Sequence, residues 1–354
     1  MITIDRPSAP VVGRGAVRDR PLPPIDDATR RELLAGAALL LATAACGTGG
    51  PAPAPAAGPR TIEHAFGSTR VPAAPERVVT LGYVDQDAVL ALGVTPVAVR
   101  QWVGDQPPAD WPWQRDLVAG TAPAALPFEL DLEQLAALEP DLILAVWAGI
   151  TESEYADLSR IAPTVPHESA HAADPFLAPW QDRTRHTGRI LGRAERADEL
   201  VAEVEDRFAQ VRARRPEFAG ATLAIVEGPV EGDVFVFTPA NLRGYVAEAL
   251  GFTVPAQLTG ADPGTGIIEL SQEQLDRVDL DVVLWIGEDR DAIRAMPLHA
   301  RLDAVREGRE VFADPPVITA LSFGTVLSLP YALDRLEPAL AAAIDGDPVT
   351  AVPA

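Results

Sequence analysis

The pattern of apolar positions predicts strands and helices in regular alternation along most of the chain. Residues 142–147 and 282–286 are apolar without polar interruption, which is typical of strands in a parallel sheet with helices on both faces. Helical patterns alternate with such strands, and in two of them a glycine, Gly93 or Gly251, follows the last apolar residue, as at a helix end. The alternation predicts an α/β fold. Further strands are expected at residues 77–81, 94–99, 222–226 and 233–237.

The sequence also repeats itself at an offset of 140 residues. Residues 131–147 align with residues 271–287, and both copies carry Glu-Gln-Leu at the same place. Each copy opens with a helix-capping residue, Asp131 or Ser271, and a glutamine follows three residues later, which is the spacing of a capping box. A short helix and an apolar strand come next in both copies. The repeat therefore predicts two lobes of the same α/β kind.

A helical stretch separates the two copies. Residues 179–216 are rich in Arg, Glu, Ala and Leu at helical spacing, and two glycines interrupt the pattern in its first part. The uninterrupted part, residues 194–214, makes a helix about 31 Å long at about 1.5 Å per residue. We therefore expect a long rigid helix between an N-terminal lobe at residues 61–178 and a C-terminal lobe at residues 217–345.

The first 45 residues have the layout of an export signal. Residues 33–45 are uncharged, but these 13 residues are fewer than the roughly 20 that cross a bilayer. The arginines at residues 30–31 precede this apolar core, as in a twin-arginine signal. Cys46 follows it, as in a bacterial lipoprotein signal, although Thr43 stands where an aliphatic residue is more usual. The alternative is an ordinary buried cysteine. Residues 46–60, mostly Gly, Pro and Ala, are then a tether.

Composition narrows the classes of partner. The 354 residues include 51 acidic side chains and 29 basic ones, all of them arginine, for a formal net charge of −22. A surface this acidic repels nucleic-acid phosphates and anionic headgroups. The single cysteine allows neither an internal disulfide nor an all-cysteine metal cluster. We therefore predict a protein that binds no nucleic acid and whose fold does not depend on oxidation.

Several short segments, taken in order, resemble one family. They are residues 62–67, 71–72, 75–79, 90–94 and 138–143. In this order they are similar to the substrate-binding proteins of ABC importers for ferric siderophores, haem and cobalamin, and the resemblance covers nearly all of residues 61–340. It implies two Rossmann-like lobes with parallel sheets joined by one long rigid helix, as in class III periplasmic binding proteins. It also implies that a large metal chelate binds in the cleft between the lobes.

The rule that ligands bind at the carboxyl ends of parallel strands selects candidate binding residues. Aromatic faces suit the apolar parts of a metal chelate, and arginines suit its oxygens. Trp147 follows a strand where the repeat has Gly287, which favours a one-sided aromatic platform, whereas Trp285 belongs to the core. Of the tryptophans in residues 101–114, Trp102 lies nearest a strand end. Ordinary packing and solvated charge remain the alternatives for these side chains. The candidates are Tyr83, Arg100, Trp102, Trp147, Asn241, Arg243 and Phe323.

Glu133 and Glu273 are equivalent positions in the repeat. A carboxylate in the first turn of a helix is stabilised by the helix dipole, which is a sufficient structural explanation. The family resemblance implies more, because one glutamate on the outer surface of each lobe pairs there with arginines of the membrane permease. Two related carboxylates would orient docking on a two-subunit permease.

The prediction that results is an exported monomer that captures a ferric siderophore and delivers it to an ABC permease. Cys46 anchors it by lipid to the outer face of the cytoplasmic membrane. We expect no covalent cofactor, no directly bound metal and no catalytic residue. Haem and cobalamin remain alternative ligands, since the sequence does not distinguish them.

Two other classes of protein fit the sequence less well. A zinc-binding protein of the same transporter type would use histidines, but His167 and His171 are bracketed by prolines and the other histidines are scattered. An α/β enzyme is disfavoured, because no G-x-G-x-x-G follows a predicted strand and the sequence has neither a G-x-S-x-G elbow nor a P-loop.

Overall fold

The computed structural model describes residues 58–346, apart from residues 103–106, 119, 121 and 288. The predicted export signal and Cys46 lie outside the described residues, as does almost all of the predicted tether. No helix in the described part of the chain is both long and apolar enough to cross a membrane. The described residues belong to one compact unit.

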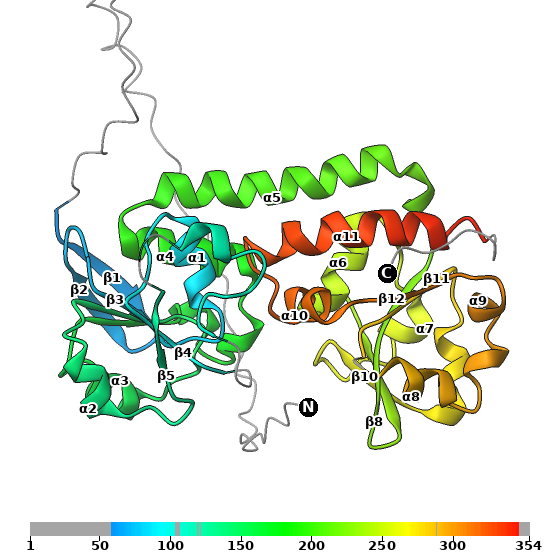
Figure 1. The fold of residues 1–354 in the computed structure, drawn as a ribbon, viewed down its shortest axis with the longest axis horizontal. Helices are drawn as coiled ribbons and strands as arrows, with labels where there is room; N and C mark the ends of the chain where they lie inside the picture. The colour runs from blue at the N-terminus through cyan, green and yellow to red at the C-terminus, as the bar shows by residue number, and fades with distance from the viewer. Residues whose placement is uncertain (1–57, 103–106, 119, 121, 288, 347–354) are drawn as a thin grey trace, which may run out of the picture. The chain divides into compact units, whose positions relative to one another are not determined.

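The first of the two main sheets is wholly parallel, as predicted (Figure 1). Its strands, in spatial order, are β5 (Ala124–Leu126), β4 (Ala98–Arg100), β3 (Val78–Thr80), β6 (Leu142–Ala145) and β7 (Thr164–Pro166). Every residue of β3 and β6 is buried, which explains why these strands are apolar without alternation. The helices of this half are α1 (Asp85–Ala91), α2 (Leu132–Ala137), α3 (Glu152–Leu158) and the 3₁₀ helices η1 (Arg115–Leu117), η2 (Ser169–His171) and η3 (Pro175–Leu177).

A separate antiparallel hairpin precedes the first sheet. It consists of β1 (Arg60–His64) and β2 (Gly67–Val71), and it packs beside β7. The buried ring of His64 bonds Thr69 across the hairpin (2.9 Å). The Thr69 hydroxyl also donates to the carbonyl of Thr164 in β7 (2.7 Å). The first bond lies within the hairpin, and the second attaches the hairpin to the edge of the first sheet.

The second sheet is mixed, which corrects the prediction of parallel sheets in both lobes. Its strands, in spatial order, are β10 (Ile267–Ser271), β9 (Asp233–Phe237), β8 (Leu223–Val230), β11 (Val282–Trp285) and β12 (Glu310–Phe312). The strands β8, β11 and β12 are parallel, whereas β9 and β10 pair in the antiparallel sense. Only Glu231 and Gly232, both with positive φ, join β8 to β9. Two such residues make a tight hairpin, and a parallel connection needs about a dozen or more.

The helices of the second half all come after residue 214 in the chain. They are α6 (Leu242–Leu250), α7 (Ala256–Thr259), α8 (Arg290–Ala295), α9 (Asp303–Arg306), α10 (Pro315–Phe323), α11 (Ser328–Ala343) and the 3₁₀ helices η4 (Pro216–Phe218), η5 (Gln272–Val278) and η6 (His299–Arg301). In both sheets the strand that comes first in the chain lies in the middle, so the order of strands is the same. The repeat in the sequence thus corresponds to a repeat in strand order, although the directions of two strands differ.

An aspartate shared by the two repeats has the same structural role in both. The Asp141 carboxylate accepts the backbone N–H groups of Glu76 (2.8 Å) and Arg77 (2.9 Å), directly before β3. The Asp281 carboxylate accepts the N–H and the hydroxyl of Thr222 (both 2.8 Å), directly before β8. Each aspartate therefore fixes the start of the central strand of its sheet.

The helical stretch predicted between the lobes, residues 179–216, consists of two helices, and the second matches the uninterrupted part predicted at residues 194–214. They are α4 (Trp180–Leu191) and α5 (Ala194–Arg214). Gly192 ends α4 in the left-handed conformation (φ 69°), which glycine adopts without steric cost. The two helices then pack closely at Gly188, where an added Cβ would lie 2.3 Å from the Cβ of Ala197. The long helix α5 also contacts α6 and α11 of the second half.

One hydrophobic cluster contains side chains from both sheets and from the helices between them. Val78 and Leu142 of the first sheet, Trp180 of α4, Phe208 of α5 and Trp285 of the second sheet all belong to it. Trp285 has no exposed surface, so its assignment to the core is confirmed. A smaller cluster lies against the first sheet alone. Because the larger cluster is continuous, the two halves share a core.

Candidate functional site

Tyr83 is surrounded by other rings at the carboxyl ends of the first sheet. It follows β3, and its ring stacks on Trp102 with the ring centroids 4.0 Å apart. The centroids of Trp147, Phe176 and Phe323 lie 5.5, 5.6 and 6.1 Å from that of Tyr83. We call these five residues the aromatic group. Phe323 ends α10, so both halves of the chain contribute to the group, and four of its members are sequence-predicted site residues.

A pocket opens beside the aromatic group. Tyr83, Trp102 and Phe323 line it, together with Arg100 and Trp111. The sequence analysis favoured Trp102 because it lies nearest a strand end, and the structure places both Trp102 and Trp111 at this pocket. The third tryptophan of the segment, Trp113, stacks on Trp111 at 5.4 Å and donates its indole N–H to the buried carboxylate of Asp87 (3.0 Å).

Trp147 lies deeper than the platform that the sequence predicts. Its side chain is 8% exposed, and the guanidinium of Arg183 covers one face of its ring at 4.0 Å from the centroid. Within the described residues its indole N–H has no hydrogen-bond partner. Buried donors normally have a partner, so this N–H is an unsatisfied donor within the aromatic group.

The carboxylate of Asp85 holds the loops that carry Tyr83 and Trp147. It accepts the backbone N–H groups of Gly82 (3.1 Å), Val146 (2.9 Å) and Trp147 (3.1 Å). A Cβ at Gly82 would lie 2.3 Å from this carboxylate, which explains the glycine. Burial raises the pKa of Asp85 to about 6, although the backbone hydrogen bonds and Arg183 oppose the rise. Asp85 thus joins the ends of two neighbouring strands.

Asp87 and Arg183 tie the second half of the chain to this site. The Thr325 hydroxyl donates to Asp87. Arg183 is buried and donates through Nη2 to the carbonyl oxygens of Phe323 (3.2 Å) and Gly324 (2.9 Å). Burial raises the pKa of Asp87 to about 6 and lowers that of Arg183 to about 10, and the attraction between the guanidinium and both carboxylates opposes each shift. The segment after α10 is thereby fixed against the first half.

The other predicted polar residues, Arg100, Arg243 and Asn241, make different contacts. Arg100 is half-buried, donates through Nε to the carbonyl of Phe128 (2.8 Å) and lies 4.2 Å above the ring centroid of Trp102. Arg243 donates to the hydroxyl of Ser322 (3.0 Å from Nη2), the residue before Phe323. Asn241 caps α6, where its side-chain oxygen accepts the N–H of Arg243 (3.0 Å). The structure therefore gives Asn241 a structural use.

The two glutamates predicted to dock a permease are exposed. Glu133 lies in the first turn of α2, where Asp131 accepts the N–H groups of Glu133 (2.9 Å) and Gln134 (3.2 Å). Glu273 lies in the first turn of η5, which is a 3₁₀ helix. Their exposure agrees with an outward role, which stays a prediction.

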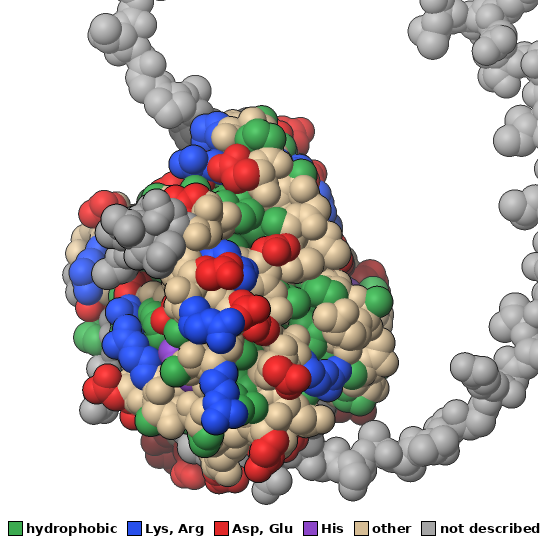
Figure 2. Space-filling view, turned by 90° about the vertical axis from the view of Figure 1, so that its right-hand side faces the viewer, with side chains coloured by type: hydrophobic (Ala, Val, Ile, Leu, Met, Phe, Trp, Pro, Cys, Tyr) green, Lys and Arg blue, Asp and Glu red, His purple; other side chains and the backbone are tan. Residues whose placement is uncertain are grey.

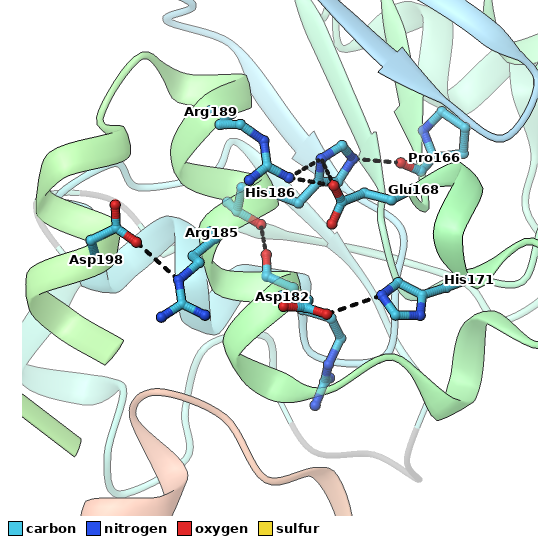
Figure 3. Close-up of polar contacts among 10 residues, drawn as sticks. Pro166, Glu168, His171, Asp182, Arg185, His186, Arg189 and Asp198 are labelled. Carbon is cyan, nitrogen blue, oxygen red and sulfur yellow. Dashed lines mark hydrogen bonds and ion pairs between the residues drawn. The ribbon is translucent and has the colours of Figure 1, made fainter. Parts of the chain in front are cut away.

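Two histidines, His171 and His186, help to hold the loop after β7 against α4, as Figure 3 shows. His186 donates from Nε2 to the carbonyl of Pro166 (3.0 Å), and burial lowers its pKa to about 4. His171 pairs with Asp182 (3.2 Å). Glu168 pairs with Arg189 of the same helix. Among the described residues, no three histidine, cysteine or acidic side chains are grouped so that they could hold a metal ion.

The sequence did not single out Phe176, Asp85, Asp87 or Arg183. The two aspartates resemble ordinary acids in the first turn of a helix, and Arg183 lies in a stretch with many other arginines. The available signal was the place of the aspartates directly after an apolar strand, where α1 is buried along most of its length. Phe176 lies in the 3₁₀ helix η3 and is 41% exposed. The prolines on either side of it, Pro175 and Pro179, were the sequence signal that this segment is unsuited to a core.

Comparisons with known proteins match most of the described chain. A model of the family described as periplasmic binding protein matches residues 78–317. A probable siderophore-binding lipoprotein of Bacillus subtilis, YfiY, is 27% identical over 78% of this chain and 86% of its own length. A periplasmic solute-binding protein of Mycobacterium smegmatis is 36% identical, with a TM-score of 0.73 over 81% of this chain and 99% of its own. PiaA of Streptococcus pneumoniae, in complex with ferrichrome, is 25% identical, with a TM-score of 0.65 over 81% and 99%.

Proposed function

The chain belongs to the periplasmic binding protein family, and we propose that it captures a ferric siderophore outside the cytoplasm and delivers it to an ABC permease. It is a substrate-binding transport protein and not an enzyme. The observation that carries the proposal is the aromatic group, which both halves of the chain build at the ends of neighbouring strands. Relatives named for siderophore binding support the choice of ligand.

The chemistry of the site suits a metal chelate. The organic part of a siderophore presents methylenes and rings, which gain free energy against aromatic faces. Its polar atoms need hydrogen-bond partners when they leave water. The indole N–H of Trp147 has no partner among the described residues, and Arg100 adjoins the pocket. A ligand with apolar walls and oxygen atoms therefore complements the site.

Titration of the intrinsic tryptophan fluorescence of the purified chain tests this function. The probes are a ferric tris-hydroxamate, a ferric tris-catecholate, ferric citrate, haem, cobalamin and Zn²⁺. We expect saturable quenching by at least one of the ferric chelates, because Trp102 and Trp147 lie in the aromatic group. Quenching by Zn²⁺ alone, or by haem or cobalamin without any ferric chelate, would reject the proposal.

Removal of the central ring should weaken binding. We expect Tyr83→Ala to raise the dissociation constant for the ferric chelate roughly tenfold or more, since a ring at the centre of a binding site contributes more than about 1.4 kcal/mol. Tyr155→Ala is the matched control, because Tyr155 is also half-buried but lies beside the β1–β2 hairpin. Equal losses in the two variants, measured by titration, would contradict the proposed site.

We further propose that Glu133 and Glu273 dock the permease. Replacement of both by glutamine should reduce cellular uptake of the ferric chelate and leave the dissociation constant of the purified protein unchanged, since both side chains are exposed. The control replaces two other exposed acids, Glu195 and Glu248, by glutamine. A loss of affinity that parallels the loss of uptake would argue against docking.

The anchor and the oligomeric state complete the proposal. We infer that Cys46 carries lipid on the outer face of the cytoplasmic membrane and that the protein acts as a monomer. The layout of the leader sequence supports the anchor, and relatives named as lipoproteins are consistent with it. Globomycin, which blocks lipoprotein signal cleavage, should cause the precursor to accumulate, whereas Cys46→Ser should release the protein from the membrane fraction.

A further inference from the structure

Three arginines adjoin the aromatic group, and each already has partners. Arg183 and Arg100 lie over the rings of Trp147 and Trp102. Arg243 binds the hydroxyl of Ser322 and lies 4.6 Å from the centroid of a further ring. A site built for an anion would keep guanidinium groups free to bind it. The partners of these three arginines therefore affect which net charge of a ligand the site favours.

Two carboxylates offset the single charge of Arg183. Asp85 and Asp87 are both buried and both interact electrostatically with Arg183. The guanidinium also donates to two backbone carbonyl oxygens. Beneath the aromatic group this set carries two negative charges and one positive charge when both aspartates are ionised. An anion that approached the rings of Trp147 and Phe323 would be repelled by this excess of negative charge.

The other two arginines also have acidic neighbours. Glu154 of α3 interacts electrostatically with Arg100, and Glu227 of β8 does so with Arg243. Around the aromatic group, these three arginines are therefore matched by four carboxylates. Figure 2 shows a different face, at the end of the molecule that carries the second sheet, and acidic and basic side chains are intermixed there. The whole chain has a net charge of −22.

We propose that the site selects ferric chelates of zero or positive net charge, of the tris-hydroxamate type, over anionic chelates. The inference rests on the proposed function and names the ligand class within it. Three hydroxamates carry three negative charges, which balance Fe³⁺, so the chelate is neutral apart from its side groups. Three catecholates carry six negative charges and leave the chelate strongly anionic. The first fits a site whose positive charges are already balanced, and the second is repelled.

A series of chelates with the same iron-binding groups and different net charges tests the proposal. Ferrioxamine B is a linear tris-hydroxamate whose free amine gives it one positive charge. Its N-acetyl derivative is neutral, and its N-succinyl derivative carries one negative charge. Dissociation constants are measured by tryptophan quenching at pH 7.5, above the pKa of about 6 that burial gives to Asp85 and Asp87. We expect the anionic derivative to bind roughly threefold to tenfold more weakly than the neutral one at low salt.

Salt separates charge from shape in this series. Screening lengths fall from about 10 Å at 0.1 M to about 3 Å at 1 M ionic strength. The ratio of the anionic to the neutral dissociation constant should therefore decrease as NaCl is added. A ratio that does not respond to salt would mean that the succinyl group is excluded by its size, and this would overturn the proposal.

A matched pair of variants changes the charge without disturbing the fold. Glu154 accepts hydrogen bonds from Thr151 at the start of α3 (2.7 Å to its N–H), and glutamine preserves such a bond. Glu154→Gln should thus uncover the charge of Arg100 and lower the anionic-to-neutral ratio. Glu152→Gln, an exposed change in the same turn, is the control and should leave the ratio unchanged. Equal shifts in the two variants would overturn the role of Arg100 and Glu154.

The outcomes also distinguish this inference from the function on which it rests. Tighter binding of the anionic derivative, or binding of a ferric tris-catecholate or ferric citrate without any hydroxamate, would overturn the inference and leave the proposed function intact. Failure of every ferric chelate to bind would remove both. Preference for the neutral and cationic members, with the expected effects of salt and Glu154→Gln, supports the charge rule.

Discussion

A single buried carboxylate determines where two of the site's rings lie. Asp85 accepts three backbone N–H groups from the loops after β3 and β6, and no neutral side chain of the same size offers the same set of acceptors. Tyr83 and Trp147 therefore depend on Asp85 for their positions, although Asp85 itself is buried beneath them. It is a positioning residue.

Asp85→Asn should weaken both the fold and the site. The amide nitrogen cannot accept a hydrogen bond, so at least one buried N–H loses its partner, at a cost of about 1–3 kcal/mol. We expect urea denaturation to show that loss of stability. Titration at pH 7.5 without urea should show weaker binding of the ferric chelate. The control is Asp289→Asn, because Asp289 is exposed and caps the short helix α8. Unchanged chelate affinity in Asp85→Asn would contradict the positioning role.

The strand-end rule selected most of the rings but not the charges beneath them. Tyr83, Trp102 and Trp147 come directly after apolar strands, so local sequence was sufficient to select them. Arg183 lies far from Asp85 and Phe323 along the chain, and its contacts depend on how α4 packs. A lone sequence carries no signal of such long-range pairing between buried charges. The role of Asn241 is different, because an asparagine directly before a helix is a local signal for a cap, and the ligand interpretation was chosen over it.

The junction between α4 and α5 depends on a glycine inside a helix. Gly188 lies within α4, and an added Cβ would lie 2.3 Å from that of Ala197 in α5. We expect Gly188→Ala to destabilise the protein by about 1–3 kcal/mol, as overpacking does, despite the better helix propensity of alanine. The measurement is chemical denaturation.

The reciprocal change supplies the control for this junction. Ala197→Gly frees the space that the new methyl group needs, so the double variant should recover part of the stability lost by Gly188→Ala. A double-mutant cycle measures that coupling. Strict additivity of the two changes would mean that the helices adjust without a clash.

Elements were predictable where their signals are local. The span of α5, Ala194–Arg214, follows from uninterrupted helical spacing. The break before it was visible only as glycines, and spacing alone did not show that α4 would pack alongside α5. Residues 233–237 were expected as a strand, and the structure has β9 there. Its direction depends on the positive φ of Glu231 and Gly232, and a glutamate in that conformation is uncommon.

At the scale of the whole molecule, the two halves share a core. The larger hydrophobic cluster includes residues of both sheets and of α4 and α5, and Asp87 and Arg183 add polar ties between the halves. Hinge motions between lobes open surfaces that pack weakly. Here an opening motion would have to expose apolar side chains and break buried hydrogen bonds.

A shared core predicts cooperative unfolding. We expect a single transition in urea, with the same midpoint by far-ultraviolet circular dichroism and by tryptophan fluorescence, because unfolding of either half removes part of the larger cluster that the other half shares. Ligand at saturating concentration should raise that midpoint without splitting the transition. Two transitions, or midpoints that differ between the probes, would show that the halves fold independently.

The way in which Arg183 holds the segment after α10 affects how this site can diversify. The guanidinium binds main-chain oxygens of residues 323 and 324, which every amino acid possesses, rather than any particular side chain. Exchange of the ring at position 323 would alter the wall presented to a guest molecule while the attachment of the backbone persists. This position can therefore accumulate changes in preference during evolution at little structural cost.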